Sequence, residues 1–486
     1  MMVVTLYTSR VILQILGVDD YGIYILVAGF VSFFSFISRG LTTAIQRFLN
    51  TALGIGDKVE LQKVFSISIN IFILMSILII TIGETIGVWF VNSHLNIHES
   101  RMYAMNWVFQ TSLLVFVVSI MRIPYNALII AHERMDFFAY ASIIEAILKL
   151  LIVFLLRIIN IDKLILYSIL FLCVTVIVNI IYYFYCKIEF SECQYKKVID
   201  ASLTSNLLSF STWSMLGQIA VIGRGQGINY FINHYYSVSV NAAQGISNQV
   251  SGAMNNLVSN FQTAFNPQLF QTYASNEINE HCRLLYSSCK FSYYLLLMMV
   301  IPICFNMEMV LLTWLSVVPQ YSIEFCNLGL ISYLLLSLSS PLTTTIFANG
   351  NIKNYQISLM IIHSTDLLIS MIVLKMGFVP YSIAIVNVFI QVVFLIIRFV
   401  FASKVSNINF SSFFNQVILP VCSTTILAMI LPILFLYNSN NTYHTFVICI
   451  IDMIWVILII YLAGLNKNEK LMINSKILQI IKKIQR

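Results

Sequence analysis

The chain has 486 residues, of which 59% are hydrophobic and only 10% are charged, and its mean hydropathy is +0.87. Soluble domains are about 45–50% apolar and about 25% charged, so this composition excludes an ordinary water-soluble protein and indicates a membrane protein. The net charge of +7 is spread along the chain, without the clustered basic face that binds nucleic acid.

A helix that crosses a bilayer needs roughly 20 apolar residues, and apolar runs of this kind follow one another from end to end. They predict an all-α integral membrane protein with about fourteen transmembrane helices. In chain order the predicted helices cover residues 1–16, 21–45, 65–91, 104–131, 137–157, 163–186, 206–234, 239–266, 284–313, 324–348, 354–376, 380–402, 412–436 and 444–463.

The seventh and eighth predicted helices, 206–234 and 239–266, are rich in Asn, Gln, Ser and Gly. Polar helices of this length are stable in a membrane only where they face protein or a watery cavity, so we expect both to face the interior. The N-terminal stretch MMVVTLYTSRVILQILGVDD lacks the basic region and cleavage site of a signal peptide. It is typical of a first span entered partway along.

The distribution of Lys and Arg predicts the orientation in the membrane. With the N-terminus in the cytoplasm, eighteen of the 27 Lys and Arg residues fall in cytoplasmic segments, Lys290 and Arg398 among them, and four fall in outer loops. Both termini are therefore predicted to be cytoplasmic. The C-terminal tail has isoleucines at helical spacing between basic residues, which predicts a helix lying on the anionic inner leaflet.

The two halves of the chain resemble each other. At an offset of 217, Pro124 and Ala131 match Pro341 and Ala348, and a second match near Thr43 has an offset of 220. The offset spans an even number of predicted helices, so the repeats have parallel topology. Two such bundles around a central cleft are typical of alternating-access transporters.

The predicted domains follow from this repeat. They are an N-terminal six-helix lobe (1–186), a cytoplasmic linker (187–205), a C-terminal six-helix lobe (206–402), two extra helices (412–463) and a basic amphipathic cytoplasmic tail (464–486).

Five cations lie within the predicted spans: Arg10, Arg39, Arg122, Lys149 and Arg224. Each would cost roughly 2.5–3.5 kcal/mol at a lipid-exposed helix centre, so we expect them to have a role. For Arg10 and Arg39, snorkelling to the membrane surface and lining a cavity both remain open. Arg122 and Arg224 have no acidic neighbour along the sequence, and we predict that both line a cavity that binds the substrate.

Lys149 follows Glu145 by one helical turn, so a local ion pair and a role in the cavity both remain open. The repeat offset also maps Lys149 onto Asp366. We hypothesise that Lys149 and Asp366 pair across the cleft and gate transport or couple it to an ion, with Glu145 as a second coupling candidate. Four of the five cations lie in the first half, which predicts a positive interior suited to an anionic substrate.

Other motifs are missing from the sequence. It contains no GxxxxGK[ST] loop for ATP and no HExxH, GxSxG or paired-carboxylate constellation. Its nine cysteines lack metal-ligand spacing, and His363, the one histidine deep in a span, is interpreted as a packing residue. We therefore expect a protein that is not an enzyme and has no metal or cofactor; a membrane polymerase or ligase of surface polysaccharide would need a large outer loop.

Three stretches resemble a known family: YTSRVILQILGVDDYGIY, RIPYNALIIAHERMDFFAYASIIEAILKL and QGINYFINHYYSVSVNAAQGISNQVSGAMNNLVSNFQTAFNPQ. They resemble the bacterial polysaccharide biosynthesis flippases, the O-antigen and oligosaccharide-unit exporters. This family shares a superfamily with the multidrug and toxin extrusion (MATE) antiporters and the lipid II flippase.

The resemblance implies a MATE-like fold of fourteen helices in two six-helix lobes in the bacterial inner membrane. It also implies movement of an undecaprenyl-pyrophosphate-linked oligosaccharide from the cytoplasmic to the outer leaflet, with membrane lipids and the polysaccharide assembly machinery as partners. Basic cavity residues would then meet the pyrophosphate. The alternative within the superfamily is a cation-coupled multidrug extrusion antiporter, whose cavity would favour acids and aromatic residues over cations.

Overall fold

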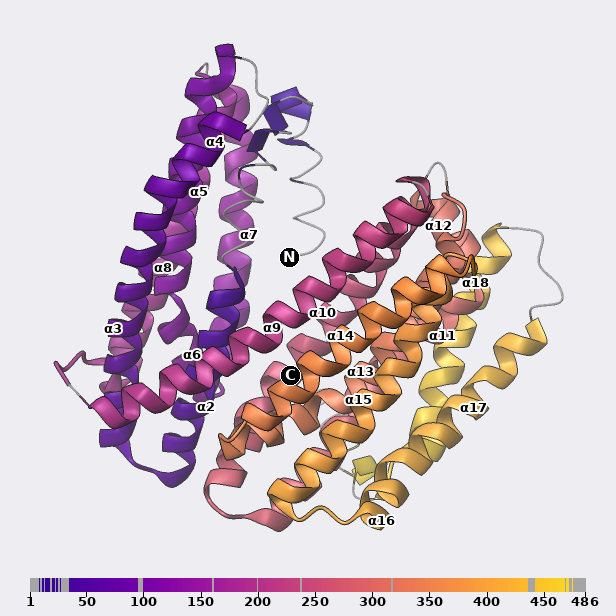
Figure 1. Ribbon diagram of the computed structural model, residues 1–486. Coiled ribbons are helices and arrows are strands. Elements are labelled where there is room, and N and C mark those ends of the chain that lie inside the picture. The colour runs from indigo at the N-terminus through magenta and orange to yellow at the C-terminus, as the bar shows by residue number, and fades with distance from the viewer. Residues whose placement is uncertain are drawn as a thin grey trace, which may run out of the picture. The chain divides into compact units, whose positions relative to one another are not determined.

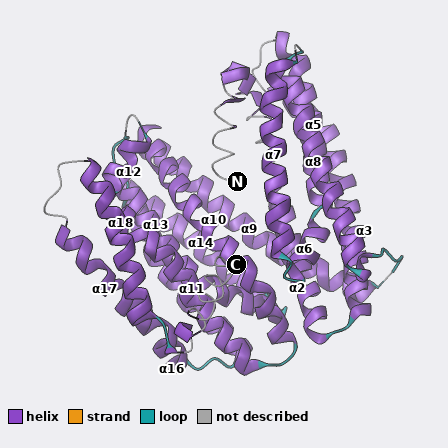
Figure 2. Cartoon of the chain, turned by 180° about the vertical axis from the view of Figure 1, so that it is seen from behind, coloured by secondary structure: helices purple, strands orange, loops and turns teal. Residues whose placement is uncertain are grey.

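The computed structural model describes residues 35–94, 99–159, 161–198, 200–236, 238–315, 318–435 and 442–467, with short runs and single positions within 8–27 and 469–474. Every regular element in this part of the chain is a helix, as Figure 2 shows, so the all-α prediction is confirmed. Most of the first predicted helix and most of the predicted C-terminal tail lie outside the described residues.

The chain divides into two compact units, Met1–Ile219 (unit 1) and Ala220–Arg486 (unit 2). The boundary falls inside one long helix, α9 (Ala201–Tyr235), whose first part belongs to unit 1 and whose second part belongs to unit 2. The predicted linker, 187–205, is in part helical, because its first residues complete α8 and its last residues begin α9.

Unit 1 consists of long helices that lie side by side (Figure 1). α8 contacts both α5 and α7, and α2 contacts α3 and α6. The elements are α2 (Ser35–Ile55), α3 (Lys58–Ile82), the π-helical turn η1 (Gly83–Gly87), α4 (Val88–His94), η2 (Glu99–Arg101), α5 (Met102–Met121), α6 (Ile123–Ala131), α7 (Met135–Ile158), α8 (Lys163–Glu189) and η3 (Ser191–Cys193).

Unit 2 contains the second part of α9 and the remaining helices. α13 contacts α10, α11 and α15, and α18 packs on α11 and α17. The elements are α10 (Val238–Ala274), α11 (Ile278–Phe305), α12 (Met307–Trp314), α13 (Ser322–Asn349), α14 (Lys353–Lys375), α15 (Ser382–Ser406), α16 (Phe410–Phe413), η4 (Phe414–Ile418), α17 (Leu419–Phe435), α18 (Thr442–Ile459) and η5 (Ile460–Gly464).

Ten described helical segments are long and apolar enough to cross a membrane, and they make this a multi-pass membrane protein. α9 and α10 are long enough to span but are not among the ten, because of the polar composition that the sequence already showed. The predicted count of fourteen is therefore not confirmed, although the helical class is.

The second predicted helix ended at residue 45, and this boundary is wrong, since α2 continues to Ile55. The polar residues beyond residue 45 fit inside the helix: buried Asn50 donates from Nδ2 to the Gln46 carbonyl at 2.7 Å, one turn earlier. The chain turns at Gly56, whose φ of +80° is a left-handed conformation that glycine adopts without strain.

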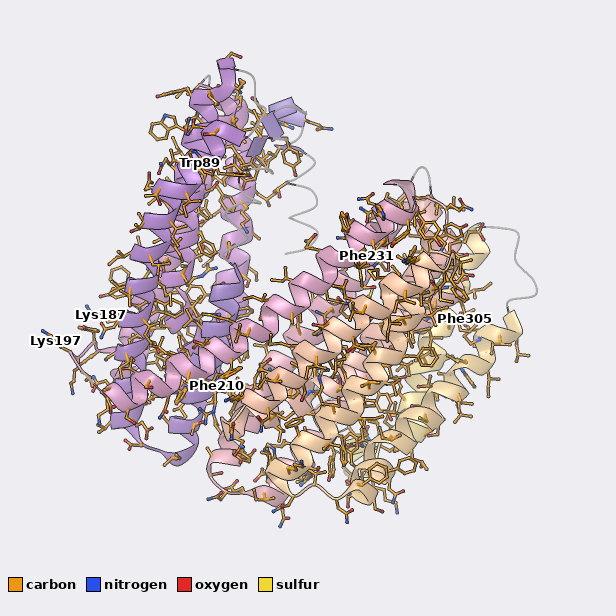
Figure 3. All side chains as sticks on the ribbon, in the orientation of Figure 1. Trp89, Lys187, Lys197, Phe210, Phe231 and Phe305 are labelled. Atoms are coloured by element: carbon orange, nitrogen blue, oxygen red, sulfur yellow. The ribbon has the colours of Figure 1, made fainter. Side chains whose placement is uncertain are left out.

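The outer faces of the spans carry large apolar side chains. On α7, Ile143, Ile147 and Phe154 are 55%, 57% and 64% exposed. Such a stripe would be unfavourable in water and is favourable against lipid tails. Figure 3 shows Lys187 and Lys197 of unit 1 on one side of this unit and well below Trp89 in this view.

The core of unit 2 contains a polar seam where α10, α11 and α13 meet. Gln262 donates to Ser292 Oγ at 3.0 Å and accepts from Ser340 Oγ at 3.0 Å. Small hydroxyl residues let membrane helices approach closely, and their hydrogen bonds satisfy one another inside the protein. The seam therefore explains how the polar α10 is stable among apolar neighbours.

The proline of the repeat has a different effect in each half. Near Pro124 the helix is interrupted at Arg122, which separates α5 from α6, whereas α13 runs continuously through Pro341. The interruption in unit 1 is therefore specific to that unit, and it places a cation at a helix junction.

Candidate functional site

A cluster of two bases and one acid lies where α5, α6 and α7 meet in unit 1. Arg122 is the residue between α5 and α6, and Glu145 and Lys149 lie one turn apart on α7. Lys149 Nζ is 2.7 Å from Glu145 Oε1, and Arg122 Nη1 is 3.6 Å from Glu145 Oε2. We call Arg122, Glu145 and Lys149 the Arg122 cluster.

The local sequence explains the position of Arg122. Pro124 lies in the first turn of α6. Backbone N–H groups in a first turn have no carbonyl acceptor within the helix, so a proline, which lacks the N–H, is tolerated there. Proline also disfavours a regular helix just before it, so α5 stops at Met121 and the side chain of Arg122 starts from a junction.

Two aromatic rings of α8 border the cluster. The guanidinium carbon of Arg122 is 5.3 Å from the ring centre of Tyr182, and Lys149 Nζ is 5.8 Å from the ring centre of Phe171. Both distances are within the range of cation–π attraction. The rings stabilise the two charges without neutralising them.

The Arg122 cluster keeps an excess of positive charge, since two cations share one carboxylate. The side chains of Arg122, Lys149 and Glu145 are 28%, 27% and 23% exposed, so all three are accessible. The 3.6 Å contact of Arg122 is longer than a hydrogen bond. Within the described part of the chain its guanidinium donates no hydrogen bond, so these donors are available to an anion.

Unit 2 holds a second charged pair, Arg224 on α9 and Asp366 on α14. Arg224 Nε is 2.6 Å from Asp366 Oδ2, and Ser370 Oγ donates to Asp366 Oδ1 at 3.4 Å. The side chain of Asp366 is only 1% exposed. A guanidinium keeps its charge in any protein environment, so Asp366 has a permanent counter-ion here.

In the sequence GRGQG around Arg224, Gly227 of α9 lies against Leu367 of α14. A Cβ at Gly227 would lie 2.6 Å from Leu367 Cδ1, so the leucine side chain would have to move to make room for one.

A cavity of about 110 Å³ lies next to this pair, between α9, α10, α13 and α15. A Cβ at Gly329 would lie 2.7 Å from Ser247 Oγ and 2.8 Å from Ser251 Oγ, so both hydroxyls would have to turn away to make room for one. A polar cavity of this size accommodates a few water molecules or one small polar group. Its polar lining comprises Arg224, Asn229, Gln244, Ser247, Asn248, Ser251, Tyr333 and Asn387.

The hypothesised partners Lys149 and Asp366 each have a different partner within their own unit. Lys149 pairs with Glu145 in unit 1, and Asp366 pairs with Arg224 in unit 2. Of the two alternatives open for Lys149, the local pair is therefore observed. An exchange of partners between the units during transport remains a hypothesis.

Two predicted site residues are not placed. Arg39 lies in α2, but its side chain is outside the described residues, and Arg10 is outside them altogether. For both, snorkelling and a place in the cavity remain open.

Two cations that the sequence assigns to the cytoplasmic side lie within helices and have partners there. Lys290 lies within α11 and is 1% exposed, with Nζ 2.7 Å from Glu469 Oε1. Arg398 lies within α15, where it donates to Ser339 Oγ and from Nε to Tyr355 Oη at 3.2 Å.

No protein-family model matches the sequence, and no curated protein matches it. Solved structures with a similar fold do exist, and they include MATE proteins and a further transporter of the MOP superfamily. The fold class of the chain is thus MATE-like, as the sequence predicts.

Three of these structures illustrate the likeness. A MATE protein in its bent conformation has a TM-score of 0.70 at 11% sequence identity, with 87% of this chain and 92% of that chain covered. An outward-facing multidrug resistance MATE family transporter gives 0.70 at 12% identity, covering 84% and 92%. A MOP superfamily transporter from Pyrococcus furiosus gives 0.68 at 12% identity, covering 85% and 93%. At this level of identity the comparison shows the fold.

Proposed function

We propose that this protein is a transporter of the bacterial inner membrane that moves an undecaprenyl-pyrophosphate-linked oligosaccharide from the inner to the outer leaflet by alternating access. Such a substrate would be a repeat unit of O-antigen, capsule or another surface polysaccharide. The observation that carries the proposal is the Arg122 cluster, an accessible cationic site among membrane-spanning helices. The MATE-like fold supports it.

The chemistry of the cluster suits a pyrophosphate. The planar guanidinium of Arg122 can donate two parallel hydrogen bonds to one phosphate, while Lys149 adds a point charge. Glu145 lies one turn before Lys149 and orients its ammonium group through their ion pair. The prenyl tail would stay in lipid, against the exposed apolar faces of helices such as α7.

We assign a different role to the Arg224–Asp366 pair. Its charges neutralise each other, and Asp366 is 1% exposed, so the pair offers less to an anion than the Arg122 cluster does. It instead links α9 to α14, and Arg224 lines the polar cavity. Arg224 is then a positioning residue, and the pyrophosphate is met by Arg122 and Lys149.

A cation-coupled multidrug extrusion antiporter is the second candidate. One structural neighbour is a multidrug resistance MATE family transporter, and Glu145 and Asp366 are acids within spans that a cationic drug could meet. Against this, each acid is already paired with a cation. The Pyrococcus furiosus neighbour, whose binding pocket of reverse polarity suggests a different function, is a precedent for such a difference within this fold.

The test is a deletion in the native strain, with lipid-linked oligosaccharides and surface polysaccharide analysed together. We expect complete repeat units to accumulate on their lipid carrier, facing the cytoplasm, while surface polysaccharide is lost. Wild type should restore the surface polysaccharide, and Arg122→Gln or Lys149→Gln should not.

Lys187→Gln is the matched control, since Lys187 is a cation near the end of α8 outside the Arg122 cluster. It should complement the deletion fully. Normal surface polysaccharide in the deletion strain, together with increased sensitivity to cationic drugs, would contradict the proposal and favour the extrusion antiporter.

A further inference from the structure

Asp452 is an acid of unit 2 that, unlike Asp366, has no hydrogen-bond or ion-pair partner within the described residues. Asp452 lies in α18 and is 0% exposed. Neither carboxyl oxygen has a hydrogen-bond partner within the described part of the chain, and no ion pair there includes it. Inside a membrane protein an isolated carboxylate is strongly unfavourable, because nothing replaces the water that solvates its charge.

Other buried charges of the same unit are compensated. Lys290 is 1% exposed and lies 2.7 Å from Glu469, which also accepts from Ser287 Oγ at 3.3 Å. Asp366 is equally buried and has Arg224 at 2.6 Å. Each of these two buried charges has a partner, whereas Asp452 has none within the described residues, and an uncharged carboxyl group is the form that such surroundings favour.

Three contacts fix the alignment of α18 and the segment after it along α11. Cys449 Sγ is 3.8 Å from the Pro302 carbonyl, Tyr294 Oη donates to the Gly464 carbonyl at 3.3 Å, and Lys290 pairs with Glu469. From the first contact to the third, the residue numbers rise along α18 and the segment after it and fall along α11, so the two run antiparallel. Asp452 lies between the first and second contacts, so it is level with the stretch of α11 from residue 294 to residue 302.

This stretch of α11 contains a carbonyl that is short of a donor. Pro302 lies inside the helix and has no N–H, so the carbonyl of Met298, four residues earlier, lacks its usual helical hydrogen bond. A neutral carboxyl group carries an O–H donor, whereas a carboxylate can only accept. The protonated form of Asp452 is thus the form that complements the proline-broken face of α11.

The titratable groups around Asp452 do not offer it a counter-ion. On its own helix Cys449 lies one turn away, and the stretch of α11 level with Asp452 contributes Tyr294, which already donates to Gly464. α17, the other helix packed on α18, has no lysine, arginine or histidine between Leu419 and Phe435. None of these side chains is a cation, and Lys290, the cation of α11 nearest in sequence to this stretch, is held by Glu469.

We infer that Asp452 is a buried proton-binding site, occupied when α18 is packed on α11 and opened only when these two helices separate. Its ligand is a proton: the carboxyl O–H bond breaks on release, the proton passes to water that enters between the helices, and no electron is transferred. The inference concerns a site that the proposed pyrophosphate recognition does not use, and its test does not require transport.

The test is infrared spectroscopy of the purified full chain at neutral pH in dodecyl maltoside, a detergent without carbonyl groups, which detects the carbonyl stretch of a protonated carboxyl group. We expect this band in wild type and in Asp366→Asn, the matched variant of a buried acid that is paired with Arg224. Asp452→Asn should lose the band. A wild-type spectrum without it, or a band that persists unchanged in Asp452→Asn, would overturn the inference.

A second measurement keeps the result interpretable if a variant folds poorly. Dicyclohexylcarbodiimide reacts with protonated carboxyl groups in apolar surroundings, so mass spectrometry of wild type should find the adduct on the peptide that contains Asp452. No adduct should form on the peptide that contains Asp366. Labelling of Asp452 that appears only after sodium is removed would show a sodium site in its place and would also overturn the inference.

Discussion

Asp366 and Glu145 are both acids within membrane-spanning helices, but their surroundings differ. The side chain of Asp366 is 1% exposed and has one close guanidinium, whereas that of Glu145 is 23% exposed and shares two cations. Removing one partner of a buried pair leaves an uncompensated charge, while an exposed pair is screened and contributes little to stability. The two sites should therefore respond differently to the same kind of substitution.

Neutralising one member of the Arg224–Asp366 pair should lower the free energy of unfolding by about 3–5 kcal/mol, because the other charge is left buried alone. The double variant Arg224→Gln, Asp366→Asn should be less destabilised than the sum of the single variants. Thermal unfolding of the four proteins in detergent measures this cycle. Additive single effects would show that the two residues do not interact.

The Arg122 cluster should behave in the opposite way. Arg122→Gln should change the free energy of unfolding by about 1 kcal/mol or less, since the side chain is partly exposed and its ion pair is long. Transport should fall about tenfold or more, because a charge-assisted hydrogen bond to the substrate is lost. Arg122→Lys should restore part of the activity, since it keeps the charge without the planar fork. A variant with intact transport would remove Arg122 from the substrate path.

At the scale of elements, two helices begin with the same cap in different settings. Asp57 Oδ1 accepts from the Val59 N–H at 2.9 Å at the start of α3, and Asp162 Oδ1 accepts from the Leu164 N–H at 3.0 Å at the start of α8. Only Asp162 also pairs with a cation, Arg101 Nη1, at 2.6 Å. Burial alone would raise the pKa of Asp162, but the backbone N–H donors and Arg101 together hold it below its ordinary value.

This difference predicts an acid-dependent effect on stability. A carboxyl whose pKa is lowered in the folded state stabilises fully above its ordinary pKa of about 3.9, and the contribution is lost as the pH falls through the folded value. Asp162→Asn keeps the cap and should lower the free energy of unfolding by about 1 kcal/mol at neutral pH. Wild type and variant should converge in acid.

Asp57→Asn is the control for this experiment, since Asp57 has the same cap without the arginine. The difference between this variant and wild type at neutral pH should be smaller than that for Asp162→Asn, because no ion pair with an arginine is lost. A constant difference between Asp162→Asn and wild type across the pH range would show that the pair with Arg101 does not contribute.

Elements were predicted well from the sequence where apolar runs are long, and poorly where polar residues continue a helix. The span at 163–186 agrees with α8 within a few residues, because its composition is almost uniformly apolar. The end of α2 was missed, because Asn50 looks like a loop residue until its hydrogen bond to Gln46 is seen. Helix ends of this kind depend on side-chain contacts and are not encoded in hydropathy.

The site was predictable only in its local part. The Lys149–Glu145 pair follows from a spacing of one turn, and it was one of two alternatives that the sequence left open. Arg224 and Asp366 are 142 residues apart, and no pattern in a single sequence joins them. The burial of Lys290 likewise depends on the position of Glu469, which comes from a different part of the chain.

For the whole molecule, the Lys and Arg distribution predicts that both termini face the cytoplasm. Alkaline phosphatase fused within the turn that ends α14, near Gly377, should then be active, because this enzyme folds only outside the cytoplasm. A fusion within the turn at Gly350 should be inactive, since the single helix α14 separates the two turns. The reverse pattern of activity would contradict the predicted orientation.

The account depends most on the movement of an anionic lipid-linked substrate by way of the Arg122 cluster. The direct measurement uses the purified full chain in vesicles that contain a labelled undecaprenyl-pyrophosphate oligosaccharide, with a membrane-impermeant reagent added outside to detect the label that arrives in the outer leaflet. Wild type should move the label, and Arg122→Gln combined with Lys149→Gln should not, although the double variant should fold as wild type does. Equal arrival of the label with wild type, with the double variant and in protein-free vesicles would contradict the account.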